Sequence, residues 1–190
     1  MKKYICLKEQ SIVDAKSKYT ITTIQPEDIE RIRLWRNDQL EILRQTDIIS
    51  QQQQIDYFDM HIWPSMESPV PKNILVGFFY ENCLIGYGGL VHISWQNLRA
   101  EISFLLDSKR VSNKDIYSSD FHNFLKLIKR LAFDYLSFNR LFVETYDIRP
   151  LHISILESSG FFREGCLRKH VRINGLWVDS LIHGCFKDVE

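Results

Sequence analysis

Residues 139–186 read NRLFVETYDIRPLHISILESSGFFREGCLRKHVRINGLWVDSLIHGCF, and this stretch decides the fold. Its first part, residues 141–146, has the β-branched and aromatic composition of a strand. A short helix is predicted over residues 149–159, because Pro150 suits the first helical position and Gly160 suits the residue just past the end. The stretch therefore alternates strand and helix within about twenty residues, as α/β domains do.

The remainder of the same stretch predicts a β-hairpin. Two strands, roughly residues 161–173 and 177–186, are joined at Asn174-Gly175. Asn-Gly is the strongest short-range hairpin signal, because both residues tolerate the positive φ of a tight turn. The chain therefore ends in two antiparallel strands.

Periodicity predicts the upstream elements. In chain order they are a strand at 19–24, a helix opened by Pro26, a helix at about 50–62 with Ser50 as N-cap, strands at 74–80, 83–94 and 99–106, and a long helix beginning near Ser118. This order predicts an α/β fold with a mixed, mostly antiparallel sheet and helices on both faces. Residues 1–17 lack clear periodicity and are set apart as an N-terminal extension of one domain at residues 18–190.

Composition excludes several classes of protein. The chain has 190 residues, and its 24 basic residues balance 24 acidic ones. The chain therefore lacks the net positive charge that favours binding to nucleic acid or to an anionic membrane. No apolar run approaches the roughly 20 residues that span a bilayer, and the N-terminus lacks the apolar core of a signal peptide. We expect a cytoplasmic protein with no nucleic-acid or membrane partner.

Cysteine and histidine spacing gives no sign of a disulfide framework or a metal site. The four cysteines stand far apart without a CxxC pair: Cys6, Cys83, Cys166 and Cys185. The histidines show no metal-ligand spacing. We expect idle thiols and no metal.

Several motifs, in order, resemble the GNAT superfamily of N-acyltransferases, and in particular its branch that acetylates ribosomal-protein N-termini, polyamines and amino sugars. The motifs are Gly160-Phe161, Glu164-Gly165, Leu167-Arg168, Gly175, Trp177 and Asp179, with IRLWRND at 32–38 and AEISFLLD at 100–107. The resemblance covers roughly residues 18–187. It implies splayed fourth and fifth strands, and direct transfer of an acetyl group from acetyl-CoA to a primary amine of a small molecule, an amino sugar or a peptide N-terminus.

The resemblance also implies where acetyl-CoA binds. The main chain of one strand would hold the pantetheine arm, at Ser103, Phe104, Leu105 and Leu106. The start of the long helix would hold the pyrophosphate, because a first helical turn offers free N–H groups. Ser118 and Ser119 would contribute there, with Arg110 adding charge. Arg149 either reaches the CoA phosphates or is a surface arginine at a helix start.

Two positions depart from the family's pattern. The family's glycine-rich turn, Q/R-x-x-G-x-G/A, corresponds to IYSSDF at residues 116–121, which contains no glycine. Ser118, Ser119 and Asp120 therefore either cradle phosphate or simply cap a helix. The family's tyrosine that protonates the departing thiolate corresponds to Leu156, which cannot donate a proton.

Direct transfer needs a base for the attacking ammonium and a donor for the tetrahedral oxyanion. Glu101 is the first candidate base, Glu144 the second and His152 the third, and a structural role would also explain each of them. Main-chain amides near Phe104 and Leu105 would bind the oxyanion.

The side of the site that binds the amine acceptor would be lined by residues of the first helix and of the loop after the strand at 83–94. These are Trp35, Arg36, Asn37 and Trp95, although core packing also explains Trp35. The departures at residues 116–121 and at Leu156 leave a second hypothesis open, a catalytically degenerate domain that binds a partner or another ligand. The C-terminal strands offer an edge for a possible homodimer.

Overall fold

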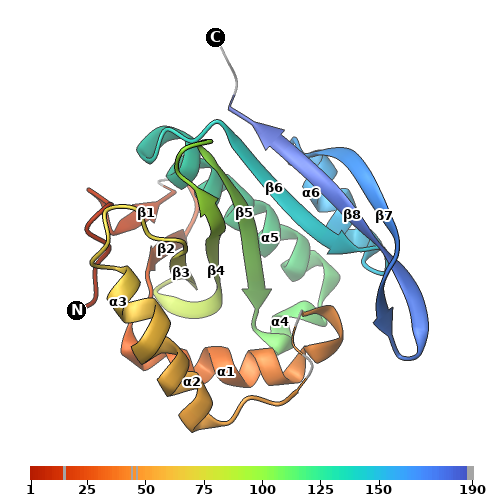
Figure 1. Cartoon of the computed structure of the whole chain (residues 1–190), viewed down its shortest axis with the longest axis horizontal. Helices are drawn as coiled ribbons and strands as arrows, with labels where there is room; N and C mark the ends of the chain where they lie inside the picture. Colours follow the sequence, from red (N-terminus) through yellow and green to blue (C-terminus); the bar gives the residue numbers. More distant parts are fainter. Residues whose placement is uncertain (15, 44, 46, 188–190) are drawn as a thin grey trace.

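The computed structural model describes residues 1–14, 16–43, 45 and 47–187. One sheet of eight strands runs through the molecule in the order β1-β2-β3-β4-β5-β6-β8-β7 (Figure 1). The strands are β1 Ser11–Val13, β2 Tyr19–Thr23, β3 Ile74–Tyr80, β4 Cys83–Ser94, β5 Arg99–Leu106, β6 Arg140–Tyr146, β7 Phe162–Ile173 and β8 Leu176–Phe186. All neighbours are antiparallel except β5 and β6, which are parallel. The predicted mixed, mostly antiparallel sheet is confirmed.

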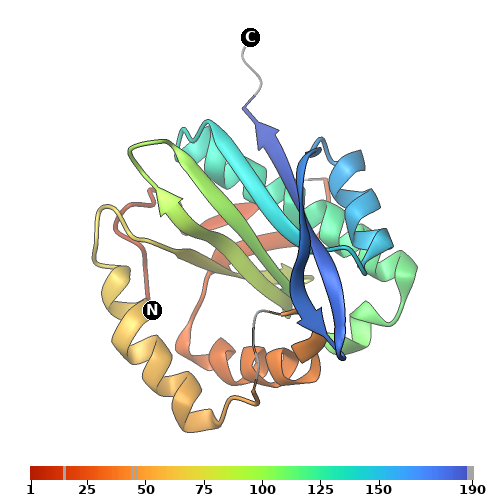
Figure 2. The same cartoon turned by 45° about the vertical axis from the view of Figure 1, so that its right-hand side comes forward.

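The helices lie on both faces of this sheet. They are α1 Ile29–Asp38, α2 Gln51–Tyr57, α3 Trp63–Ser65, α4 Ser108–Val111, α5 Lys114–Lys129 and α6 Pro150–Ser158, with short 3₁₀ turns η1 Pro26–Asp28 and η2 Leu40–Ile42 and π-helical turns η3 Phe58–Ile62 and η4 Arg130–Tyr135. Helices α5 and α6 pack side by side against the sheet (Figure 2). Helices α1 and α2 lie across the lower ends of β4 and β5 in Figure 1.

Local sequence signals place several of these boundaries. Asn174 and Gly175 both have positive φ, 49° and 82°, and join β7 to β8 as predicted. Ser50 caps α2, because its side chain accepts from the Gln53 N–H while the Gln53 side chain returns to the Ser50 N–H. Such a reciprocal cap satisfies two otherwise free helix donors.

The start of α5 corrects a prediction. The helix begins at Lys114, four residues before the expected start near Ser118. Asn113 is the N-cap, since its side-chain oxygen accepts from the N–H groups of Asp115 and Ile116. The segment between β5 and α5 contains the helical turn α4, which no sequence pattern indicates.

Residues 1–17, set apart as an extension, contribute to the sheet and to the core. Strand β1 pairs with β2 from Ser11 to Val13. Tyr4 is buried, and its hydroxyl accepts a hydrogen bond from the Leu75 N–H of β3. This segment therefore covers the β2–β3 end of the core.

The feature that positions the site is the limited pairing of β5 with β6. Their ladder has three residue pairs and ends at Glu101 and Phe142. Beyond it the two strands diverge, with β5 running downward and β6 to the right in Figure 1. Within the described parts of the chain, no strand pairs with this edge of β5 past Glu101.

No helix among the described residues has both the length and the apolar character that crossing a bilayer requires.

Candidate active site

A cavity of about 220 Å³ lies where β5 and β6 have separated. It is lined by Arg36, Ile42, Leu43, Val91, Glu101, Ile102, Ser103, Phe104, Phe121, Val143, Glu144, Arg149 and His152. Side chains alternate between the two faces along a strand. Phe104 faces α5, where its ring stacks on Phe121 at 4.6 Å between centroids, so Glu101 and Ser103 face the other side. The cavity therefore receives side chains from both faces of the sheet.

Glu101 lies at the last paired position of β5 and is only 8% exposed. Its Oε2 lies 2.7 Å from Nδ1 of His92, whose own side chain is largely exposed. The pair thus connects a buried carboxylate in the cavity to an imidazole in contact with solvent. Such an arrangement can pass a proton from the cavity to water.

An irregularity in β4 brings His92 to this carboxylate. The β4–β5 register is broken between Val91 and Ser94, and His92 has a φ of 49°. A left-handed conformation at a residue other than glycine is uncommon and carries a cost in backbone energy. The bulge turns the imidazole toward the neighbouring strand, as β-bulges near active sites often do.

Glu144 faces the cavity from β6, on the opposite side of the gap from Glu101. Its Oε1 lies 3.8 Å from Nε2 of His170 on β7. Two carboxylates on different strands, both named from the sequence as candidate bases, therefore border the same space.

The helix side of the cavity holds a chain of three polar groups. Arg149 lies at the N-cap of α6, and its Nη2 donates to the Tyr117 hydroxyl at 2.8 Å. That hydroxyl lies 2.7 Å from Nδ1 of His152. The His152 ring also stacks on Phe121, 4.1 Å between centroids. The chain links the first turn of α5 to the first turn of α6.

Burial sets the protonation states of His152 and Tyr117. Desolvation, with smaller contributions from Arg149 and His183, lowers the pKa of His152 well below its ordinary value. Desolvation raises the pKa of Tyr117, opposed by the Arg149 guanidinium. A neutral imidazole beside a protonated phenol accepts at Nδ1, which places the ring proton on Nε2.

The predicted pantetheine-binding residues of β5 occupy different environments. Ser103 and Phe104 line the cavity, whereas Leu105 and Leu106 are buried. The Leu106 carbonyl accepts from the side chain of Gln39 at 2.8 Å.

The predicted phosphate residues need correction. Ser118 and Ser119 lie in the second turn of α5, whereas the free N–H groups of a helix belong to its first turn. Arg110 forms two hydrogen bonds, of 2.6 and 2.9 Å, to fully buried Asp120. Asp120 therefore anchors a helix rather than facing a phosphate, and Arg110 is its counter-ion.

The predicted acceptor residues separate into one that lines a cavity and three that do not. Arg36 lines the first cavity and also a second one of about 420 Å³, formed with residues of the α1–α2 connection. Asn37 holds that connection by hydrogen bonds to both main-chain groups of Ile49. Trp35 is buried in the core, and Trp95 packs on Phe138 and donates to the Pro71 carbonyl.

Two residues of the site escaped sequence reasoning. His92 carries no signal, because only the bulge in β4 brings it to Glu101. Tyr117 stood within the segment taken to be a phosphate turn, and recognising Asn113 as the N-cap would have placed it on α5. Among the residues that the structure describes, no cluster of three histidine, cysteine or carboxylate side chains could hold a metal ion.

Comparison with known proteins supports the resemblance found in the sequence. A family model described as "Acetyltransferase (GNAT) domain" matches residues 21–182. No curated protein sequence matches the chain.

Solved structures with the same fold include three informative neighbours. A chimera of spermidine N-acetyltransferase SpeG from Vibrio cholerae and hSSAT has 18% identity and a TM-score of 0.75, covering 90% of this chain and 96% of its own. The Vibrio cholerae spermidine N-acetyltransferase in complex with CoA and spermine has 17% identity and a TM-score of 0.75, over 89% and 95%. A probable acetyltransferase has 22% identity and a TM-score of 0.64, over 90% of this chain and 93% of its own.

Proposed function

Because the chain belongs to the GNAT acetyltransferase family, we propose that it transfers an acetyl group from acetyl-CoA directly to a primary amine within the cavity between β5 and β6. The observation that carries the proposal is the lining of this cavity from both faces of the sheet. Two substrates can then meet there, one from each side, which makes their reaction effectively intramolecular.

Acetyl-CoA would enter from the side of α5 and α6. The free edge of β5 from Ser103 onward offers main-chain groups to the amide groups of the pantetheine arm, as an added strand would use them. A volume of about 220 Å³ is below the range typical of pockets for whole drug-sized ligands, so it accommodates only the reacting end. The phosphates of CoA would lie outside this cavity, near Arg149 and the first turn of α5. To bind them, the first-turn N–H groups would have to release their hydrogen bonds to the Asn113 side chain.

Glu101 is the proposed general base. A carboxylate at the last paired residue of β5 faces the acceptor side and accepts the proton of the attacking ammonium, directly or through a water molecule. His92, hydrogen bonded to Glu101 and open to solvent, then carries that proton away. Glu144 borders the same space and helps to bind the ammonium form of the acceptor.

His152 is the proposed donor to the departing thiolate, in place of the tyrosine that Leu156 replaces. His152 and Leu156 are one turn apart on the same face of α6. As the C–S bond breaks, the His152 Nε2–H donates a hydrogen bond that stabilises the departing thiolate, while the Tyr117 hydroxyl, donating to Nδ1, holds the ring in this tautomer. A neutral imidazole acting as a donor is known enzyme chemistry.

The acceptor is a small molecule with a primary amine. The structural neighbours named for spermidine support a small amine acceptor over a protein side chain. An amino sugar and a peptide N-terminus are the other members of the proposed class.

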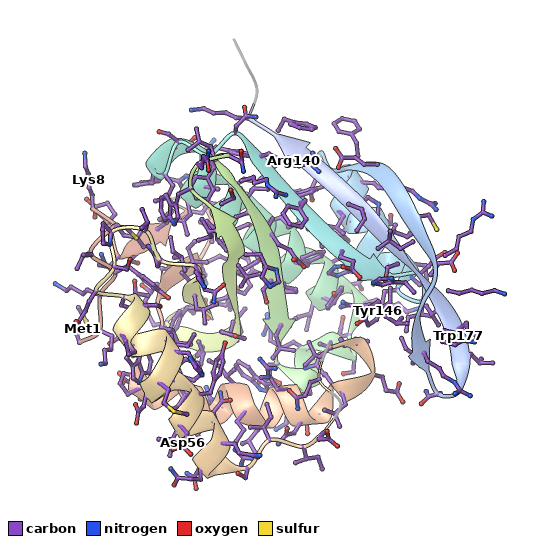
Figure 3. All side chains as sticks on the ribbon, in the orientation of Figure 1. Met1, Lys8, Asp56, Arg140, Tyr146 and Trp177 are labelled. Carbon is purple, nitrogen blue, oxygen red and sulfur yellow. The ribbon has the colours of Figure 1, made fainter. Side chains whose placement is uncertain are left out.

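We further propose a homodimer through the β7–β8 hairpin, where Leu176 and Trp177 are largely exposed. Figure 3 shows Trp177 on this hairpin. Sedimentation that finds only monomer across a wide concentration range would contradict this proposal.

Glu101→Gln tests the proposed function. The variant should bind acetyl-CoA as wild type does in calorimetry, while amine-dependent thiol release falls about a hundredfold or more, since general bases contribute on that scale. Glu67→Gln, at an exposed site, is the matched control and should keep full activity. Wild-type protein that binds no acetyl-CoA at millimolar concentration would refute the function and favour a degenerate domain.

A further inference from the structure

Arg36 occupies an unusual place between the two cavities. It projects from α1 and lines both the cavity between β5 and β6 and the cavity beside the α1–α2 connection. Its Nε donates to Gln45 Oε1 at 2.9 Å, which orients the guanidinium. The buried phenol of Tyr87 lies against it, so Arg36 opposes the rise in the pKa of Tyr87 that burial causes.

Arg36 has no carboxylate partner among the described residues. Its helix neighbour Arg33, in contrast, is paired with Glu30 at 2.6 Å. A guanidinium has five N–H donors, and with one donated to Gln45 and another directed to the Tyr87 phenol, donors remain for a ligand. A half-buried cation that lacks a counter-ion is a costly arrangement unless a ligand supplies the negative charge.

The charges around Arg36 divide the cavity into two parts. Glu101 and Glu144 border the gap between the strands, where they suit an ammonium group. Arg36 stands on the α1 side, where it suits an anion. From this separation we infer that the acceptor is an amine that also carries a carboxylate or phosphate group, and that Arg36 binds this anion through paired hydrogen bonds.

This inference rests on the proposed function and narrows its substrate class. A planar guanidinium matches carboxylate and phosphate oxygens two at a time, which fixes the orientation of the ligand. With the anion on Arg36, the amine of the same molecule is directed toward Glu101. A polyamine carries only positive charges, so its far end would be repelled by Arg36.

Matched acceptor pairs test the inference. β-Alanine is compared with 3-aminopropanol, and glucosamine 6-phosphate with glucosamine, each with acetyl-CoA and purified full-length protein; spermidine is the cationic reference. For at least one pair we expect the anionic member to have a kcat/KM about tenfold or more above its uncharged partner, as a charge-assisted contact gives. The pair that shows the preference distinguishes carboxylate from phosphate.

Variants of Arg36 then locate the preference. Arg36→Gln should bring kcat/KM for the anionic member down to that of the uncharged one, and Arg36→Lys should keep only part of the preference because a lysine cannot make the paired contact. Arg31→Gln is the control, since Arg31 is exposed on the same helix and lines neither cavity. Unchanged thermal unfolding of the Arg36 variants shows that they are folded.

Failure of the inference differs from failure of the proposed function. Acetyl transfer that prefers spermidine or the uncharged amines, or a preference that survives Arg36→Gln, contradicts the inference alone. Calorimetry of the same acceptors with CoA in place of acetyl-CoA measures binding without turnover. Equal affinity for both members of every pair would contradict the inference even if the protein proved inactive.

Discussion

Single residues define the proposed chemistry, and sequence reasoning reached most of them. Glu101, Glu144, His152, Arg36 and Arg149 were all named from the sequence, and all line one cavity. Their roles stay predictions. His92 was out of reach, because its contact with Glu101 depends on a break in the β4–β5 register that no local motif announces. Trp35 and Trp95 were named for the acceptor but pack in or against the core.

The buried imidazole of His152 makes stability depend on pH. In the unfolded chain a histidine gains a proton as pH falls below about 6.5, whereas in the folded chain burial keeps His152 neutral. The unfolded state then binds more protons, so stability decreases as pH falls from the ordinary histidine pKa toward the lower folded value.

We predict that His152→Gln reduces this loss. Between about pH 7.5 and about pH 5.5 the wild type should lose about 1 kcal/mol more unfolding free energy than the variant, because one pKa unit corresponds to roughly that energy. Urea titrations at the two pH values measure the difference. His61→Gln, at an exposed site, should behave as wild type, and equal losses in all three proteins would contradict the prediction.

At the scale of elements, helix α5 shows where pattern reading fell short. The apolar spacing from Phe121 onward is clear in the sequence, but the resemblance to the family predicts a start near Ser118, at the position of its glycine-rich turn. In the structure the helix begins at Lys114, four residues earlier, with Asn113 as its N-cap. The start of a helix depends on which of several possible capping residues the tertiary contacts favour. Here Asp120 lies within the helix and faces the core, where it pairs with Arg110, so it cannot be the cap.

Asp120 connects α5 to two other elements. Its carboxylate accepts from Arg110 at the α4 turn and from the Tyr19 hydroxyl of β2, and it is fully buried. We predict that Asp120→Asn lowers the unfolding free energy by about 3 kcal/mol, since removing one charge of a buried pair leaves the other uncompensated. Thermal and urea unfolding measure this loss. Asp115→Asn, exposed in the first turn of α5, should change little; a similar small effect of Asp120→Asn would show that the pair does not anchor the helix.

At the scale of the whole molecule, the order of helices and strands in the sequence is enough to predict the architecture. Apart from the α4 turn and the start of α5, the strand and helix signals from residue 19 onward match the observed elements, and the Asn-Gly hairpin falls where it was predicted. The addition of β1 to the sheet and the burial of Tyr4 could not be predicted, because residues 1–17 have no periodic pattern and depend on contacts with β2 and β3. The site itself arises from topology, since it occupies the place where a parallel pair of strands separates.

A crystal structure of the protein with CoA tests the central claim most directly. The account predicts the pantetheine arm beside β5, hydrogen bonded to main-chain groups within residues 103–106, with the sulfur in the cavity between Glu101 and His152. Arg149 should then have moved toward the phosphates, away from the Tyr117 hydroxyl. CoA bound elsewhere on the molecule, with the gap between β5 and β6 left empty of it, would contradict the account.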